Sequence, residues 1–211
     1  MPRETVPRFG GTERAFHWVF AAGFLVLLAT GAVMYLPDLA TLVGRRPLVK
    51  TVHLWGAVAW VAGLVGVVAA GDRRALARTW RQAERLDHDD LRWLRRRPAR
   101  PGRFNAGQKL NLMATGASGI IFVATGAMMW LGERDHRFIV PGAGVVHVVA
   151  AVGAAASLTG HLYLALVHPS TRPALRGMVT GRVDAAWARR HHPRWATPGD
   201  DPAPSHDRQS S

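Results

Sequence analysis

The chain contains no cysteine among its 211 residues. Without a thiol it can neither form a disulfide nor offer a thiolate to a metal ion or iron–sulfur cluster, and it cannot attach a c-type haem through a CxxCH motif. Acidic residues are also scarce, because 14 Asp and Glu stand against 27 Lys and Arg, and the formal net charge is +13. Metal chemistry within this chain would therefore rest on other ligands, among which are its 10 histidines.

A polar stripe, which every soluble amphipathic helix needs, is missing from the apolar parts of the chain. Residues 57–70, for example, read AVAWVAGLVGVVAA. Four apolar segments are each close to or longer than the ~20 residues that span a bilayer, and they cover residues 15–36, 51–70, 110–131 and 141–167. The sequence therefore predicts an all-α integral membrane protein, with a four-helix bundle at 15–169. We expect the first segment to be retained, since it exceeds the apolar length of a signal peptide.

Basic residues are distributed unevenly between the two sides of this predicted bundle. The N-terminal arm (1–14), the connection 71–109 and the region after the last segment hold 22 of the 27 Lys and Arg, and the other two connections hold 5. The positive-inside rule therefore places both termini and the long connection of this multi-pass protein in the cytoplasm. Within the C-terminal region we expect a cytoplasmic segment at 170–195 and a disordered tail at 196–211, which is rich in Pro and polar residues.

Within the long basic connection, Leu76, Trp80, Ala83 and Leu86 recur at helical spacing among arginines. This pattern predicts a helix in the headgroup region, with Trp and Leu facing the acyl chains and Arg facing anionic lipid. A solvated and partly disordered loop is the alternative. Nucleic-acid binding is not expected, because the positive-inside rule already accounts for the charge and no recognition motif accompanies it.

Four histidines lie near the ends of apolar segments, where an ionisable side chain is a functional candidate by default. His17 begins the first segment and lies near the cytoplasmic face, whereas His53 begins the second segment and lies near the outer face. The fourth segment carries His147 in its outer half and His161 in its inner half. Depth therefore predicts two pairs, His53 with His147 and His17 with His161.

The spacing on the fourth segment indicates what these pairs could bind. His147 and His161 are 14 residues apart, so their side chains differ by only about 40° in direction and by about 21 Å along the axis. A b-type haem needs two imidazoles that face each other across its iron. We therefore predict two stacked b haems, the outer one bound by His53 and His147 and the inner one by His17 and His161. A lone membrane histidine could instead hydrogen-bond a neighbour, and a shared zinc or copper ion is excluded by the distance between the pairs.

Glycines near these positions could leave room for a flat macrocycle. Gly56 lies one turn after His53, and Gly31 and Gly126 lie in similar stretches, ATGAVMYL at 29–36 and ATGAMMWL at 124–131. These glycines are candidates for haem packing. Close contact between helices is the alternative explanation.

A polar cluster precedes the third apolar segment, where residues 103–111 read RFNAGQKLN. Asn105, Gln108, Lys109 and Asn111 bring hydrogen-bonding groups to the depth of the inner histidine pair, next to the free N–H groups of a helix N-terminus. Such donors could hold the carbonyl oxygens of a quinone. The alternative to a quinone site is that these residues only cap the helix and that the Lys109 side chain extends to the membrane–water interface.

These motifs together resemble one known family, the gamma subunit of respiratory formate dehydrogenase, a dihaem cytochrome b. The resemblance runs from RFGGTERAFHW around His17 through HLWG, FNAGQKLN and ATGAMMWL to GHLYLALVHP and GMVTGRVDAAWARRHHPRW. It implies a multi-pass, four-helix anchor in the bacterial inner membrane that holds two b haems. It also implies that quinone, either menaquinone or ubiquinone, is reduced next to Asn105, Gly107, Gln108 and His161.

The resemblance further implies partners. A molybdenum or tungsten alpha subunit would oxidise formate, and an iron–sulfur beta subunit would pass electrons to the outer haem. This chain would then transfer electrons and reduce quinone, without catalytic residues for formate oxidation itself. Two alternatives stay open at this point: the same dihaem module in a hydrogenase or thiosulfate reductase complex, and a haem-free channel or proton carrier that uses membrane histidines.

Overall fold

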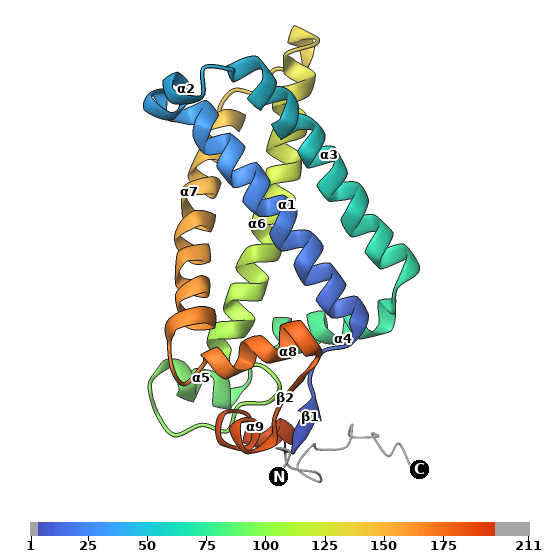
Figure 1. Ribbon diagram of the computed structural model, residues 1–211, viewed down its shortest axis with the longest axis vertical. Helices are drawn as coiled ribbons and strands as arrows, with labels where there is room; N and C mark the ends of the chain where they lie inside the picture. The colour runs from blue at the N-terminus through green and yellow to red at the C-terminus, as the bar shows by residue number, and fades with distance from the viewer. Residues whose placement is uncertain (1–3, 197–211) are drawn as a thin grey trace, which may run out of the picture.

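Four long helices form the body of the protein in a computed structural model that describes residues 4–196 (Figure 1). Each is long and apolar enough to cross a membrane. The fourth of them continues without a break into a π-helical turn at Tyr163–Val167. The four helices are α1 (Gly11–Tyr35), α3 (Arg46–Ala70), α6 (Ala106–Gly132) and α7 (Ala143–Leu162). The predicted all-α bundle of four membrane-spanning helices is thus confirmed.

Three of these helices begin four or five residues earlier than their apolar segments predict. The first turn of α1 is polar and is stabilised by Glu13, whose carboxylate accepts a 2.7 Å hydrogen bond from the Gly10 amide. Helix α3 has Pro47 in its first turn, and α6 is capped by Asn105. Apolar composition marks only the part of a helix that contacts lipid, so these polar first turns lie outside the predicted segments.

Within the bundle α1 packs on α3 and α6 packs on α7. The contact between α1 and α3 is centred on Trp60, which is buried and donates a 3.1 Å hydrogen bond from its indole nitrogen to the Phe20 carbonyl. Gly23 permits this approach, because a Cβ atom there would stand 2.1 Å from Cδ1 of Trp60. At the C-terminal end of α1, the short helix α2 (Pro37–Val43) leads into α3.

The long basic connection contains two helices, α4 (Arg73–Glu84) and α5 (His88–Leu94). Helix α4 lies across the end of the bundle (Figure 1), and Asp72 caps its N-terminus. The predicted helix is therefore present, and its apolar side packs on the bundle only in part. Ala83 is buried, whereas Trp80 is 41% exposed, although its ring lies so close to Gly116 of α6 that a Cβ atom there would stand 2.9 Å from it.

The two ends of the chain form one folded unit, which we call the terminal cap and which comprises residues 4–10 and 168–196. Strand β1 (Thr5–Pro7) pairs antiparallel with β2 (Arg182–Asp184), with Val6 opposite Val183. A small core of Val183, Trp187 and Ala188 lies beneath this ribbon. The remaining elements of the cap are η3 (Arg172–Ala174), α8 (Leu175–Thr180), α9 (Ala185–His191) and α10 (Pro193–Ala196).

The ribbon joins the N-terminal arm to the C-terminal segment, two regions that the sequence predicts to be separate. The terminal cap, α4 and α5 all lie at the same end of the bundle (Figure 1). The three arginine-rich regions are thus gathered at one end, as the charge distribution predicts. The expectation of a disordered tail falls almost entirely on residues 197–211, which lie outside the described part of the chain.

Candidate functional site

The structure brings the four membrane histidines together in two pairs. His53 on α3 faces His147 on α7, with ring centroids 6.4 Å apart and ring planes at 65°. At the other depth His17 on α1 faces His161 on α7, with centroids 6.3 Å apart and planes at 54°. These are the pairs that depth and charge predict. Helix α7 contributes one histidine to each pair, so it links the two depths.

The separation within each pair suits a metal atom between the rings. Two imidazoles that bind one metal from opposite sides, with metal–nitrogen bonds of about 2 Å, have ring centroids roughly 6 Å apart. The observed 6.3 and 6.4 Å agree with this arrangement. In direct contact, by comparison, aromatic rings approach to about 4.5–7 Å, so the distance alone does not distinguish the two cases. The environment of the rings is therefore important.

Threonine hydroxyls supply that environment at the outer pair. Oγ1 of Thr30 lies 2.8 Å from Nδ1 of His53, and Oγ1 of Thr125 lies 2.8 Å from Nδ1 of His147. A hydrogen bond at Nδ1 leaves Nε2 as the nitrogen available to a metal. Neither threonine is among the site residues that the sequence predicts. The signal was the repeated ATGA of residues 29–32 and 124–127, where each threonine precedes a glycine.

The glycines proposed for haem packing have different surroundings. A Cβ atom on Gly31 would stand 3.5 Å from Cε1 of His53, and one on Gly126 would stand 3.7 Å from Cε1 of His147. Both glycines therefore lie against the outer imidazoles. Gly56 instead faces α1, since a Cβ atom there would first meet Leu27, at 3.6 Å. At Gly56 the structure shows a helix contact.

The inner pair has a more open environment. His161 is exposed on α7, and the π-helical turn begins two residues after it. Such turns occur often at functional sites. His17 packs edge-on against Trp18, whose indole nitrogen donates a 3.1 Å hydrogen bond to the Met178 carbonyl in the terminal cap. The terminal cap is thus tied to the residue next to His17.

The first turn of α6 contains the residues predicted to bind quinone. Asn105 and Gln108 form a reciprocal capping box: the Asn105 side-chain oxygen accepts from the Gln108 amide at 2.9 Å, and the Gln108 oxygen accepts from the Asn105 amide at 3.1 Å. Gly107 lies against the Trp93 ring of α5, because a Cβ atom there would stand 3.0 Å from Cη2. The side-chain NH₂ groups of Asn105 and Gln108 donate no hydrogen bond within residues 4–196.

Two other polar residues of this motif have structural partners. The ammonium group of Lys109 is buried, where it pairs with Asp90 at 2.5 Å and donates to the Arg85 carbonyl at 2.9 Å. Lys109 therefore fastens α5 to α6 and does not reach toward the interface. Asn111 accepts a 3.0 Å hydrogen bond from the Ser157 hydroxyl of α7, one turn before His161.

Behind this turn lies a cluster of buried cationic groups. Arg103 pairs with Glu13 at 2.7 Å. Arg8 is buried beside it, and burial, followed by the charge of Arg103, lowers the pKa of Arg8 to about 10. Burial, followed by the charge of Arg8, lowers the pKa of His192 to about 3. At neutral pH Arg8 is therefore charged and the His192 imidazole is neutral.

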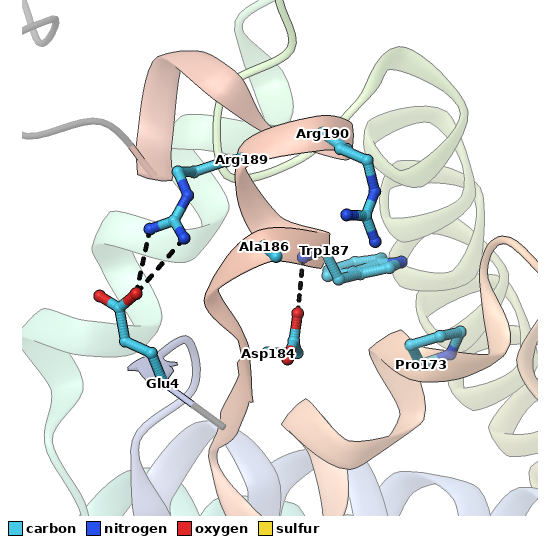
Figure 2. A pocket seen from close by; sticks show the side chains of 7 residues that line it. All are labelled: Glu4, Pro173, Asp184, Ala186, Trp187, Arg189 and Arg190. Carbon is cyan, nitrogen blue, oxygen red and sulfur yellow. Dashed lines mark hydrogen bonds and ion pairs between the residues drawn. The ribbon is translucent and has the colours of Figure 1, made fainter. Parts of the chain in front are cut away.

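A separate depression of about 510 Å³ opens on the terminal cap. Figure 2 shows that its charged groups are largely used in folding: Arg189 pairs with Glu4 at 3.3 Å, and Asp184 accepts a 2.7 Å hydrogen bond from the Trp187 amide. Its lining includes none of the predicted histidine or quinone-site residues. It is therefore a surface feature of the cap.

Comparisons with known proteins agree with this arrangement. The family described as prokaryotic cytochrome b561 matches residues 8–181. The formate dehydrogenase cytochrome b556(fdo) subunit of Escherichia coli K12 is 27% identical over 207 residues, covering 92% of each chain. The formate dehydrogenase cytochrome b556 subunit of Haemophilus influenzae is 24% identical, over 86% of this chain and 78% of that subunit.

The nitrate-inducible cytochrome b556(Fdn) subunit of E. coli K12 is 23% identical, over 87% of this chain and 86% of its own length. The resemblance to formate dehydrogenase cytochrome subunits that the motifs indicate is thereby confirmed. Because the family match includes all four helices and both histidine pairs, the chain belongs to the prokaryotic cytochrome b561 family.

Proposed function

We propose that this chain is the membrane cytochrome b subunit of a formate dehydrogenase complex, which passes electrons from an iron–sulfur subunit to a quinone. The observation that carries the proposal is the presence of two opposed histidine pairs at two depths of one bundle, with ring centroids 6.3 and 6.4 Å apart. The relatives named above are cytochrome subunits of formate dehydrogenases, which supports this choice of complex.

His53 and His147 would be the iron ligands at the outer site, and His17 and His161 would be those at the inner site. Two b haems held there would supply one-electron transfer between the two sides of the membrane. The protein's own contribution is to fix the imidazoles from rigid helices. At the outer site it also directs Nδ1 toward threonine, and Nε2 is then free for the metal.

Quinone would bind at the first turn of α6, beside the inner pair. The capping box uses the side-chain oxygens of Asn105 and Gln108, so both NH₂ groups remain available to a quinone carbonyl. The Trp93 ring lies against Gly107 of the same turn. His161 is exposed, which suits a position next to a bound quinone.

The arginine-rich end of the bundle would face the cytoplasm of a bacterial cell, in accord with the positive-inside rule. Quinone would then take its protons from that side, and the iron–sulfur subunit would dock at the opposite end. Formate oxidation would belong to a molybdenum or tungsten subunit. This chain would act as the electron-transfer and quinone-reducing part of the complex.

A reduced-minus-oxidised absorbance spectrum of the purified protein tests this proposal. We expect b-type bands in the wild type, and we expect these bands to lose about half their amplitude in the His161→Ala variant. The same variant should also lose quinone reduction. His88→Ala is the matched control, because His88 is an exposed histidine of α5, away from both pairs; this variant should keep the full spectrum. An unchanged spectrum in His161→Ala, or a colourless wild-type protein, would overturn the assignment.

A further inference from the structure

The two ATGA stretches place threonine in the same relation to histidine on both sides of the outer pair. Thr30 lies on α1 and contacts His53 of α3, whereas Thr125 lies on α6 and contacts His147 of α7. Both Oγ1–Nδ1 distances are 2.8 Å. Two different helix pairs thus provide equivalent hydrogen bonds to the two opposed rings.

The direction of these hydrogen bonds follows from the backbone carbonyls that each hydroxyl also contacts. Oγ1 of Thr30 lies 2.8 Å from the Val26 carbonyl and 3.2 Å from the Leu27 carbonyl. Oγ1 of Thr125 lies 2.6 Å from the Ile121 carbonyl. A carbonyl oxygen only accepts, so the single hydroxyl proton is donated to it. The hydroxyl oxygen is then left to accept from Nδ1–H of the imidazole. Each threonine therefore selects the tautomer with a lone pair on Nε2.

The inner pair differs in this respect. Within residues 4–196 neither His17 nor His161 has a hydrogen-bonded side-chain partner. The two pairs have nearly the same geometry, since their centroid distances differ by only a tenth of an ångström. Besides the greater exposure of His161, hydrogen bonding at Nδ1 is thus a chemical difference between the outer and inner sites.

We propose that Thr30 and Thr125 are positioning residues that lower the reduction potential of the outer haem below that of the inner haem. This inference rests on the proposed function. An Nδ1–H that is donated to an acceptor increases the basicity of the ligating nitrogen, which favours the oxidised metal. With the lower potential at the outer site, electrons that enter there move toward the inner site down the potential gradient.

A redox titration of the purified complex, followed at the haem absorbance bands, tests this inference. In the Thr30→Val/Thr125→Val double variant, which removes both acceptors with little change in shape, the lower-potential component should shift upward. We expect a change of about tenfold in the reduction equilibrium, which equals about 59 mV for a one-electron couple. The higher-potential component should not move.

Two further variants separate positioning from packing. Thr30→Ser/Thr125→Ser retains the hydroxyls and should restore the wild-type potential. Thr159→Val is the matched control, because Thr159 on α7 makes the same kind of bond to its own helix, 2.9 Å to the Ala155 carbonyl, without a histidine partner; it should leave both potentials unchanged. The low-spin electron paramagnetic resonance signal of the outer site should change in the valine variant alone.

The outcomes distinguish the inference from the function on which it rests. If the valine variant holds two haems per chain and its potentials equal those of the wild type, the threonine inference is wrong and the haem assignment stands. An equal shift with serine or with Thr159→Val would also overturn the inference. If the wild-type protein binds no haem, the proposed function itself fails.

Discussion

Nε2 of His192 lies 3.1 Å from the guanidinium nitrogen Nη2 of Arg8, although 184 positions separate the two residues. Both side chains are buried. The other ring nitrogen of His192 lies 2.8 Å from the carbonyl oxygen of Gly102, which can only accept. Nδ1 therefore carries the proton, and Nε2 accepts from Arg8. A neutral imidazole thus joins the N-terminal arm, the residues before α6 and the C-terminal segment.

This contact predicts that acid weakens the terminal cap. The pKa of His192 is lowered from 6.5 to about 3 by burial and by the charge of Arg8. Between these two values the unfolded chain binds a proton that the folded chain does not, so the free energy of unfolding falls as pH decreases below about 6.5. The loss amounts to at most about 1.4 kcal/mol per pH unit. Thermal unfolding in detergent at pH 7.5 and pH 5 measures it.

His192→Gln provides the control, since a glutamine can accept from Arg8 and donate to Gly102 without titrating. The stability of this variant should decline less between pH 7.5 and pH 5 than that of the wild type. Equal declines would show that other groups cause the acid sensitivity.

The buried pair of Lys109 and Asp90 should be important for folding. Lys109→Met leaves the Asp90 carboxylate buried without its partner, and breaking such a pair typically costs about 3–5 kcal/mol. We expect low yield or a strongly lowered melting temperature for this variant. Adding Asp90→Leu should recover part of the loss, because no unpaired charge then remains but the capping hydrogen bond from the Asp87 amide is lost. Failure of the double variant to recover stability would contradict the ion-pair explanation.

Isosteric changes can separate capping from quinone binding at α6. Asn105→Asp/Gln108→Glu keeps the oxygens that accept the capping hydrogen bonds and removes both NH₂ donors. Quinone reduction should slow by roughly three- to tenfold for each lost hydrogen bond, while the haem spectrum and the melting temperature stay close to those of the wild type. A wild-type rate of quinone reduction would show that these residues only cap the helix.

Gly23 should tolerate no side chain. A Cβ atom at this position would stand 2.1 Å from Trp60, so Gly23→Ala should force α1 and α3 apart at a cost of about 1–3 kcal/mol. Gly66 on α3 is the matched control, because a Cβ atom there meets nothing within 4 Å. We expect Gly66→Ala to unfold at or slightly above the wild-type temperature. Equal effects of the two substitutions would contradict the packing argument.

The bundle could be predicted from sequence because its signals are local. Four apolar segments predict the helices, and the distribution of arginine predicts an orientation in which His17 and His161 lie at the same depth. The terminal cap could not be predicted in this way. Its ribbon pairs Thr5 with Asp184, and nothing in three-residue strands distinguishes them from loop. Such a contact depends on the whole bundle bringing both ends of the chain to one place.

The environment of the outer histidine pair was also beyond sequence reasoning. A threonine in an apolar helix usually bonds its own backbone, so neither Thr30 nor Thr125 stands out alone. Only the crossing of α1 with α3 and of α6 with α7 places each hydroxyl next to an imidazole. The polar start of α6 was ambiguous for a related reason, because Asn105 and Gln108 have the residue types of both a capping box and a ligand site.

The assignment of both histidine pairs depends on the haem content per chain. This content is measured as the pyridine haemochrome of the purified protein, divided by the protein concentration. We expect two b haems per chain in the wild type and one in each of the single variants His147→Ala and His161→Ala. A wild-type value of one or zero, or two haems retained in both variants, would contradict the assignment.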